Sequence, residues 1–343
     1  MQHLKSLEKL ISIKEINELK VTVLTGSDNP RERTRKLFSI SSGKAKIVIG
    51  THALFQKKVH FNNLRLAVID EQHKFGVMQR FRLEKKGDVN SIIMSATPIP
   101  RSLALTVFGD RDLTIIKEKP KNRLGIQTFV ISRRKIKQLL HKLGKQMSKG
   151  QQVYWVCPLI EEAENIRLSN SNDRFAYLKK EFSEFKVGLI HGQMSSEDKE
   201  CELKKYKDRE VDILVSTTVI EVGIDNPNAT VIVIENANRF GLSQLHQLRG
   251  RVGRGSEKSY CFLMYDGNLS DQAIQRLKTM RETQDGFEIA ERDMALRGSG
   301  DLLGTMQSGH KIFKLSEVVE EPELFLEANK LVQDTETLPF EQS

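Results

Sequence analysis

The sequence predicts an α/β fold with two domains. Short runs of apolar, β-branched residues alternate along the chain with longer amphipathic stretches. Runs that are apolar throughout, rather than at every second position, are typical of strands buried on both faces of a parallel sheet. A chain of 343 residues is long enough for two hydrophobic cores. The stretch at residues 118–123 is charged, contains a proline and is poor in apolar residues, so we expect the domain boundary near it.

Eight apolar runs are candidate strands, three before the expected boundary and five after it. They are Ile47–Gly50, Leu66–Asp70, Ser91–Ser95, Val153–Cys157, Val187–His191, Ile213–Ser216, Val231–Glu235 and Tyr260–Tyr265. Two amphipathic stretches, Ile131–Met147 and Ser195–Tyr206, are expected to be helices. Trp155 lies within an apolar run, so we expect it in the core rather than as a stacking platform for bases.

The composition is that of a globular protein with a basic body. Hydrophobic residues make up 38% and charged residues 29%, and the net charge is +9. Three Lys and eight acidic residues follow residue 310, so residues 1–310 carry +14 and end in an acidic tail. A basic body suits a polyanion such as nucleic acid. With no transmembrane-length segment, signal-peptide pattern or CxxC pair, we expect a cytoplasmic protein without membrane contact, zinc site or disulfide framework.

The segment Gln244–Gly255 contains two Gly-Arg pairs at a fixed spacing, preceded by Gln247. Guanidinium groups at Arg251 and Arg254, held by flanking glycines, can reach a γ-phosphate and match the charge that develops during phosphoryl transfer. Taken alone, the segment is equally consistent with a basic turn on the surface.

Two carboxylates, Asp70 and Glu71, follow the apolar run that begins at Leu66. In an open α/β sheet, ligands bind beyond the carboxyl ends of the strands. Asp70 can hold Mg²⁺, usually through water, while Glu71 orients and deprotonates an attacking water. A bare Asp-Glu pair is often only a polar turn, but the Gln72-His73 that follows favours the catalytic interpretation.

Turns that carry hydroxyl groups follow a strand in each half of the chain. Thr51-His52 does so in the first half, and Thr217-Thr218, with Gly223 and Asp225 further on, does so in the second. Such hydroxyls can donate to DNA phosphates, and Asp225 could meet a ribose hydroxyl or an arginine. Two such contacts on one phosphate backbone, made alternately as a cleft opens and closes, would move a protein along nucleic acid. An ordinary strand-to-helix turn would explain the glycine but not the whole string.

These segments together resemble the motifs of superfamily 2 helicases. Asp70–His73 resembles motif II, Ser95–Thr97 motif III, Thr217–Asp225 motif V and Gln247–Arg254 motif VI. Within that superfamily, the strings DEQHKFGV at residues 70–77 and SATPIPR at residues 95–101, with residues 240–255, resemble the RecG family of bacterial branched-DNA helicases. Residues 287–309 resemble the translocation motif that this family shares with the transcription-repair coupling translocase. The resemblance covers residues 1–314.

The resemblance implies a fold, cofactors and partners. The fold would be α/β, with two RecA-like parallel-sheet motor domains, the first incomplete, and a C-terminal helical-hairpin translocation motif. The implied parts are residues 1–120 (motifs Ia to III), 121–268 (motifs IV to VI), 269–310 (translocation motif) and 311–343 (acidic tail). The cofactors would be ATP and Mg²⁺, and the partner branched or forked duplex DNA. The protein would be a monomer acting in fork regression and Holliday junction processing, during recombination and repair.

The resemblance also assigns roles to single residues. Those at the reaction centre would be the Mg²⁺ ligand Asp70, the water-activating Glu71 and the finger residues Arg251 and Arg254. Those beside the nucleotide would be Gln247, Gly223 and Asp225. Those that contact nucleic acid or couple ATP turnover to duplex movement would be Thr51, His52, Thr217, Thr218, Arg276, Arg297 and Gln307. Arg297 would reach across a helical hairpin to orient the following loop on DNA.

The chain departs from the family pattern in three respects. It has no wedge domain and no GxxxxGK[ST] phosphate loop, and Met1-Gln2-His3 falls on the family's Gln-His just after that loop. Met306 stands where the family usually has arginine, and Ser299 where it usually has proline, which would weaken coupling. We therefore expect an N-terminally truncated chain that does not hydrolyse ATP efficiently by itself. A separate N-terminal fragment carrying the wedge and the phosphate loop would be its partner.

Two other interpretations stay open. A non-catalytic DNA-binding fragment from a split or decayed gene would bind DNA in a salt-sensitive manner without depending on ATP. The coupling-factor translocase is the other candidate, but Gln72-His73 and the absence of a polymerase-binding region in the sequence argue against it.

Charge reversal at Arg297 is expected to weaken duplex binding or movement, because the residue belongs to the segment that resembles the translocation motif. Binding to a labelled forked duplex is the measurement, because it needs no ATP turnover. Unchanged behaviour of the Arg297→Glu variant would contradict the assignment of residues 287–309.

Overall fold

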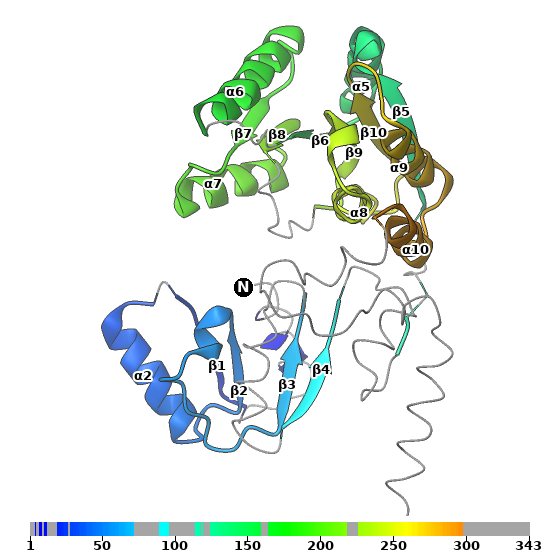
Figure 1. Cartoon of the computed structure of the whole chain (residues 1–343). Helices are drawn as coiled ribbons and strands as arrows, with labels where there is room; N and C mark the ends of the chain where they lie inside the picture. The colour runs from blue at the N-terminus through cyan, green and yellow to red at the C-terminus, as the bar shows by residue number, and fades with distance from the viewer. Residues whose placement is uncertain are drawn as a thin grey trace, which may run out of the picture. The chain divides into compact units, whose positions relative to one another are not determined.

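The computed structural model of the chain describes residues 19–71 except Ser27, then 89–95, 124–158, 164–217 and 226–297, with a few isolated residues elsewhere. The chain divides into two compact units, Met1–Ala96 and Thr97–Ser343, and each is described by itself (Figure 1). The domain boundary expected near residue 120 falls mostly among residues outside the described part.

The described residues of the first unit form two pairs of short parallel strands. β1 (Val21–Leu24) pairs with β2 (Ile47–Gly50), and β3 (Leu66–Ile69) pairs with β4 (Asn90–Ile93). Helix α2 (Pro30–Ser41) connects β1 to β2, and the 3-10 helix η1 (His52–Phe55) follows β2. Asn29 caps α2 by accepting the Glu32 N–H at 2.9 Å. Leu24, Ile40, Ala53 and Val59 form the buried centre of the α2, β1 and η1 packing.

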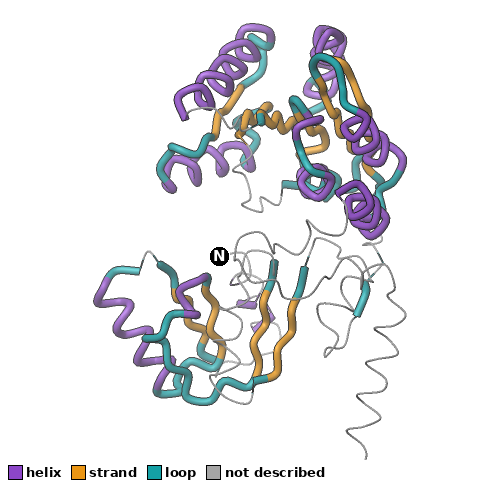
Figure 2. Tube along the Cα trace, in the orientation of Figure 1, coloured by secondary structure: helices purple, strands orange, loops and turns teal. Residues whose placement is uncertain are grey.

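The second unit is a six-stranded parallel sheet with helices on both faces (Figure 2). Its strand order is β5 (Ile126–Ser132), β10 (Ser259–Tyr265), β9 (Ala229–Ile234), β6 (Gln152–Cys157), β8 (Ile213–Thr217) and β7 (Val187–Ile190). Helices α5 (Ile136–Met147) and α6 (Glu164–Glu181) pack on one face. The other face carries α7 (Ser196–Lys207), α8 (Leu242–Arg249), α9 (Asp271–Glu282) and α10 (Gly286–Arg297). Two 3-10 helices, η3 (Arg133–Lys135) and η4 (Ala237–Arg239), complete the described elements of this unit.

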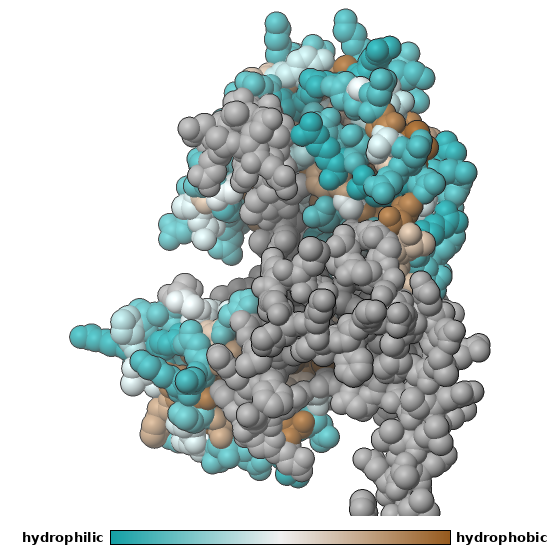
Figure 3. Space-filling model, viewed as in Figure 1, coloured by the Kyte–Doolittle hydropathy of each residue, from teal (hydrophilic) through white to brown (hydrophobic). Residues whose placement is uncertain are grey.

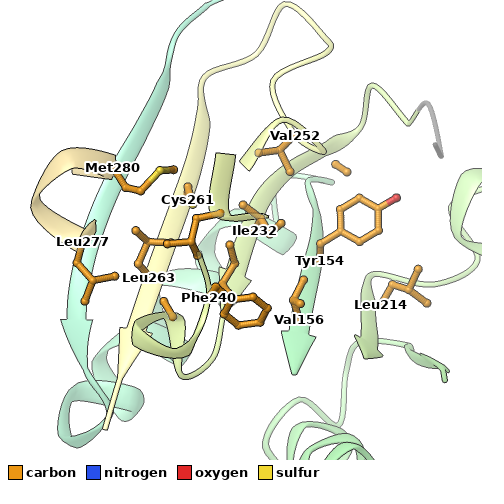
Figure 4. Close-up of a cluster of buried hydrophobic side chains, with 14 of the residues drawn as sticks. Tyr154, Val156, Leu214, Ile232, Phe240, Val252, Cys261, Leu263, Leu277 and Met280 are labelled. Atoms are coloured by element: carbon orange, nitrogen blue, oxygen red, sulfur yellow. The ribbon is translucent and has the colours of Figure 1, made fainter. Parts of the chain in front are cut away.

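The central strands bury side chains on both faces of the sheet. In β6, Val153 and Trp155 face α5 and α6, whereas Tyr154 and Val156 face the side of α7 to α10. Figure 4 shows the second of these cores, where Leu277 and Met280 of α9 lie beside the strands. Burying one large aliphatic side chain stabilises the fold by about 1.5–3 kcal/mol. The expectation that Trp155 is a core residue is confirmed, because it is fully buried.

The predicted α/β class with a parallel sheet is confirmed, but two strands were missed. Neither is a continuous buried run: β1 alternates between half-buried and buried residues. The first five residues of β5 alternate between half-buried and exposed, because β5 lies at the edge of its sheet. The predicted helix over residues 131–147 was therefore wrong at its start, since Ile131 and Ser132 belong to β5. The outer surface of the described parts is mainly hydrophilic in the view of Figure 3.

A buried ion pair ties α6 to the end of β9. Glu235 accepts the indole N–H of Trp155 at 2.5 Å and pairs with Arg174 of α6. The side chains of Glu235 and Arg174 are both 11% exposed. The guanidinium also lies over the rings of Trp155 and Tyr177, 5.6 and 5.2 Å from their centroids. Both charges are therefore compensated inside the second unit.

Replacing Glu235 by Gln is expected to lower the free energy of unfolding by about 3 kcal/mol, because a buried Arg174 would lose its counter-charge. Urea denaturation followed by the emission of Trp155, the only tryptophan, measures the effect. Asp266→Asn is the control, since it breaks an Arg133–Asp266 pair whose side chains are both 52% exposed. We expect this control to cost less than about 1 kcal/mol. Equal effects of the two substitutions would contradict the prediction.

Candidate nucleotide and nucleic-acid site

Asp70 and Glu71 lie directly beyond the carboxyl end of β3. The Glu71 N–H donates to Asp70 Oδ1 at 2.9 Å, and Glu71 has a φ of +53°. A left-handed backbone is costly for any residue other than glycine, and such conformations cluster at functional sites. The bend leaves Asp70 exposed and Glu71 half-buried. A carboxylate is therefore accessible at the strand end where the sequence predicts phosphate chemistry.

The donor set at this strand end fits a magnesium ion held mainly by water and phosphate. Among the described residues, no group of three or more His, Cys, Asp or Glu side chains could hold a metal ion. Mg²⁺ in phosphoryl-transfer sites keeps several waters and binds one or two carboxylates together with substrate phosphates, so it needs no such group. The exposed Asp70 carboxylate suits that role.

The finger residues follow helix α8, whose apolar side is buried against the sheet. Leu242 and Leu245 are fully buried, and the helix ends where the Gly250 N–H donates to His246 O at 3.0 Å. Beyond it, the Arg251 N–H donates to Leu248 O at 3.0 Å. Arg251 and Arg254 both remain partly exposed. We call residues 250–255 the finger segment.

Two glycines fix where the finger segment lies. Gly253 has a φ of +77°, and a Cβ on it would lie 2.8 Å from Cγ1 of Ile126, the first residue of β5. A Cβ on Gly255 would lie 2.8 Å from the carbonyl oxygen of Pro227, just before β9. The backbone could not approach these atoms with a side chain in the way. The finger segment therefore lies at the amino-terminal edge of the six-stranded sheet.

The charges of the two arginines act on Tyr154, near the start of β6. Burial raises the pKa of Tyr154 well above its ordinary value, and the positive charges of Arg251 and Arg254 oppose that rise. Both guanidinium groups therefore lie within electrostatic range of the same buried hydroxyl. The structure thus brings together the two residues that the sequence predicts as fingers.

The hydroxyl-bearing turns that are predicted to contact nucleic acid lie at the carboxyl ends of strands, not at their amino-terminal ends. Thr51 and His52 follow β2 in the first unit and are exposed. Thr217 is the last residue of β8 in the second unit and is buried, so its hydroxyl does not face solvent. Within the second unit, the finger segment and Thr217 therefore occupy opposite edges of one sheet.

Arg276 joins α9 to the turn that precedes α8. Its guanidinium donates to the carbonyl of Phe240 at 2.8 Å and to that of Asn238 at 3.1 Å. The sequence predicts Arg276 as a coupling residue, and the structure shows that it binds main-chain carbonyls of the second unit.

Arg249 joins the other end of α8 to the end of α9, a contact that the sequence did not predict. Arg249 is 2% exposed, and its Nη1 donates to Met280 O at 2.8 Å and Thr283 O at 2.9 Å. The last carbonyls of a helix have no intrahelical donor, so the guanidinium satisfies them. Burial lowers the pKa of Arg249 from its ordinary value. Its spacing from Leu242 and Leu245, at i+7 and i+4, was the signal that it shares their buried face.

A third contact joins α8 to α10. Ser243 donates its hydroxyl proton to Asp293 Oδ2 at 3.0 Å, and Asp293 is 4% exposed. Helix α8 is thus bound to both helices of the α9–α10 hairpin through side chains as well as apolar packing. A displacement of the hairpin relative to α8 would break these hydrogen bonds.

Several predicted residues fall outside the described part. They are Thr218, Gly223, Asp225 and Gln307, together with the family departures Ser299 and Met306. Arg297 ends α10, and only its backbone is described.

Comparison with known proteins decides the family. Residues 1–106 match the DEAD/DEAH box helicase model, residues 133–256 the helicase conserved C-terminal domain, and residues 283–335 domain 3, C-terminal, of ATP-dependent DNA helicase RecG. The ATP-dependent DNA helicase RecG of Synechocystis sp. is 47% identical over 328 residues, which are 95% of this chain and 39% of that protein. That of Streptococcus pneumoniae is 46% identical over 332 residues, 96% of this chain and 49% of that protein. The chain belongs to the RecG helicase family.

The chain spans less than half the length of these RecG relatives. A solved structure of RecG bound to a three-way DNA junction is similar, with a TM-score of 0.70 and 39% identity over 94% of this chain and 42% of that one. The structure of S. cerevisiae Dbp5 bound to RNA and ADP BeF3 has a TM-score of 0.57 at 13% identity over 85% of this chain and 77% of that one, a likeness of fold alone. The two regions of this chain that match the helicase models, residues 1–106 and 133–256, are RecA-like domains. Within the described residues, no helix could cross a membrane.

Replacing Gly253 by Ala is expected to destabilise the second unit by about 2–3 kcal/mol, since strain at a positive φ adds to a clash with Ile126. Gly150→Ala is a matched control, because Gly150 has a φ of +78° with no described atom within 4 Å of a Cβ. The control should cost about 1 kcal/mol from backbone strain alone. Urea unfolding followed by Trp155 emission measures both. If the two variants are equally stable, the close packing of the finger segment is refuted.

Proposed function

We propose that this chain is the motor portion of a RecG-type ATP-dependent helicase or translocase that acts on branched DNA. Its reactions would be fork regression and Holliday junction processing in recombination and repair. The observation that carries the proposal is the anchoring of α8 to the α9–α10 hairpin by Arg249, Arg276 and Ser243–Asp293. The helix that precedes the finger residues is thereby bound to the elements that resemble a translocation motif.

The proposed chemistry is phosphoryl transfer from ATP to water. Asp70 binds Mg²⁺ through water, and Glu71 orients and deprotonates the attacking water. Arg251 and Arg254 stabilise the charge that develops on the transferred phosphoryl group. The residues that contact the nucleotide are Gln247, Gly223 and Asp225. ATP supplies the phosphoryl group and the free energy for movement.

The proposed nucleic-acid contacts come from both units. Residues 19–71 contain ten Lys or Arg against four Asp or Glu, which favours binding of a phosphate backbone. Thr51 and His52 would grip DNA from this unit, and Thr217 and Thr218 from the other, after a local rearrangement that exposes the Thr217 hydroxyl. Arg297 and Gln307 would transmit ATP turnover to the duplex, while Arg276 positions α9 on the second unit.

The proposal also covers the setting in which the chain works. It would act in the cytoplasm as a monomer on branched or forked duplex DNA. A wedge and a phosphate loop from outside these 343 residues would complete the active site, because the 343 residues contain no GxxxxGK[ST] string. The same observation favours a second candidate function, a non-catalytic DNA-binding fragment.

The polypeptide of residues 1–343, assayed alone, is expected to hydrolyse ATP no faster than its Glu71→Gln variant, with or without forked DNA. It has no glycine-rich loop to provide backbone N–H groups, a lysine charge and a hydroxyl for the phosphates and Mg²⁺. Steady-state release of inorganic phosphate is the measurement. Turnover stimulated by DNA above the variant would contradict the prediction.

A mixing experiment distinguishes the two candidate functions. A fragment with the wedge and phosphate loop should restore turnover to the wild-type chain but not to Arg254→Ala, if this chain is the motor portion. A mixture that binds DNA without any gain in turnover would favour the non-catalytic fragment.

A further inference from the structure

The loop after β1 and the turn after β2 lie side by side in the first unit. β1 and β2 are parallel, with Leu24 opposite Gly50, so Thr25 and Thr51 follow at neighbouring strand ends. Paired strands are about 4.8 Å apart. A Cβ on Gly50 would lie 2.5 Å from the carbonyl oxygen of Leu24, so the absence of a side chain permits this close approach.

Arg33 of α2 binds both of these segments at once. Its Nη1 donates to Thr25 O at 3.1 Å, and its Nη2 donates to Gln56 Oε1 at 2.7 Å. Gln56 closes η1, because its own N–H donates to Ala53 O. A planar guanidinium holds its donors at fixed angles, so two acceptors on different nitrogens fix the distance between the loop and the turn. A lysine ammonium cannot reproduce that geometry.

Asp28 holds the same loop from its other side. Its carboxylate accepts the Thr25 N–H at 2.9 Å and the Thr25 hydroxyl at 3.0 Å, and Lys36 donates to it at 2.6 Å. Burial acts to raise the pKa of Asp28, but the hydrogen bonds from Lys36 and Thr25 outweigh it and lower the pKa below its ordinary value. The carboxylate is therefore ionised at neutral pH. Thr25 is fixed through its N–H, its hydroxyl and its carbonyl.

The outer side of this pair of segments is exposed. Gly26, Thr51 and His52 are all exposed, and no described atom lies within 4 Å of a Cβ placed on Gly26. Main-chain N–H groups and hydroxyls at such a site can contact phosphate oxygens. The network beneath them consists of Asp28, Arg33, Lys36 and Gln56.

We propose that Arg33 is a positioning residue that holds Thr25-Gly26 and Thr51-His52 together as one surface for the phosphate backbone of DNA. This inference rests on the proposed function and adds a residue and a second loop to it. Arg33 acts through the loop and the turn, since both of its terminal nitrogens bind protein acceptors.

DNA binding by the purified 343-residue chain tests the proposal without any need for ATP turnover. Fluorescence anisotropy with a labelled forked duplex is measured over a range of salt concentrations for Arg33→Gln, Arg33→Lys and Gln56→Met. We expect all three to weaken binding about tenfold, the loss that corresponds to one charge-assisted hydrogen bond. Gln56→Met changes no charge, so its salt dependence should match that of the wild-type chain.

Arg35→Gln is the matched control, because Arg35 is exposed on the same helix and no described residue forms a hydrogen bond or ion pair with its side chain. Loss of a simple phosphate contact reduces the slope of log K against log salt by about 0.9. If Arg33→Lys binds like the wild-type chain, or Gln56→Met has no effect, Arg33 is only a surface cation and the proposal is overturned. The active fraction of each variant, from titration at high DNA concentration, separates weaker binding from misfolding.

Amide hydrogen exchange tests the positioning independently of DNA. Arg33→Lys should speed exchange in residues 25–28 and 51–56 and leave β6 unchanged. Unaltered exchange at both segments overturns the proposal even where the wild-type chain fails to bind DNA. Failure of the wild-type chain to bind DNA would instead overturn the proposed function.

Discussion

Arg249 is the contact on which the geometry of the finger segment depends, because it places a buried positive charge between that segment and α9. A buried charge is costly unless hydrogen bonds compensate for its desolvation. Two main-chain carbonyls and His246 Nδ1 supply that compensation at 2.8, 2.9 and 3.1 Å. Charge-assisted hydrogen bonds contribute about 1.5–3 kcal/mol each, so separating the end of α8 from the end of α9 has a high free-energy cost. Because Arg251 follows only two residues later, this contact also restricts its position.

Gly253 restricts the path of the finger segment from its other side. Arg249 fixes where the segment starts, and the close approach of Gly253 to Ile126 fixes where it goes. The order of residues therefore has a physical cause: a buried arginine, then a glycine and a partly exposed arginine, and then a glycine at positive φ followed by a second partly exposed arginine. Partly exposed guanidinium groups on a rigid backbone are preorganised for a phosphate, which lowers the cost of binding it.

The sequence predicted the strands that are buried along their whole length, and it missed strands in which burial varies from one residue to the next. The core strands β6, β8 and β9 are buried at every position and mostly apolar because helices cover both faces, so their runs were clear. β5 lies at the sheet edge and carries Gln127 and Thr128, which obscured it. The finger segment could be predicted from the Gly-Arg spacing alone, since that pattern of two glycines and two arginines is present in the sequence itself.

The hydrogen-bonding roles of Arg249 and Arg33 could not be predicted in the same way. Both depend on carbonyl or amide oxygens brought close by tertiary structure, such as Met280 O and Gln56 Oε1. Only the helical spacing of Arg249 from two buried leucines indicated its burial. The roles expected of Asp70, Glu71 and Thr51 rest on their place after apolar runs and on a match to family motifs, and neither of these predicts the left-handed backbone of Glu71.

Helix α9 connects the two edges of the sheet in the second unit. Arg276 binds it to Asn238 and Phe240, which follow the carboxyl end of β9. Arg249 binds its other end, and Gln284 just beyond accepts the N–H of Ile126 at the amino-terminal start of β5. Twelve helical residues span about 18 Å, enough to cross the sheet as one stiff element. A displacement of the finger segment at one edge must therefore move α9 as a whole, or break its contacts at the other. Rigid packing of this kind changes between discrete arrangements rather than bending, which is the property that the proposed motor function would require of α9.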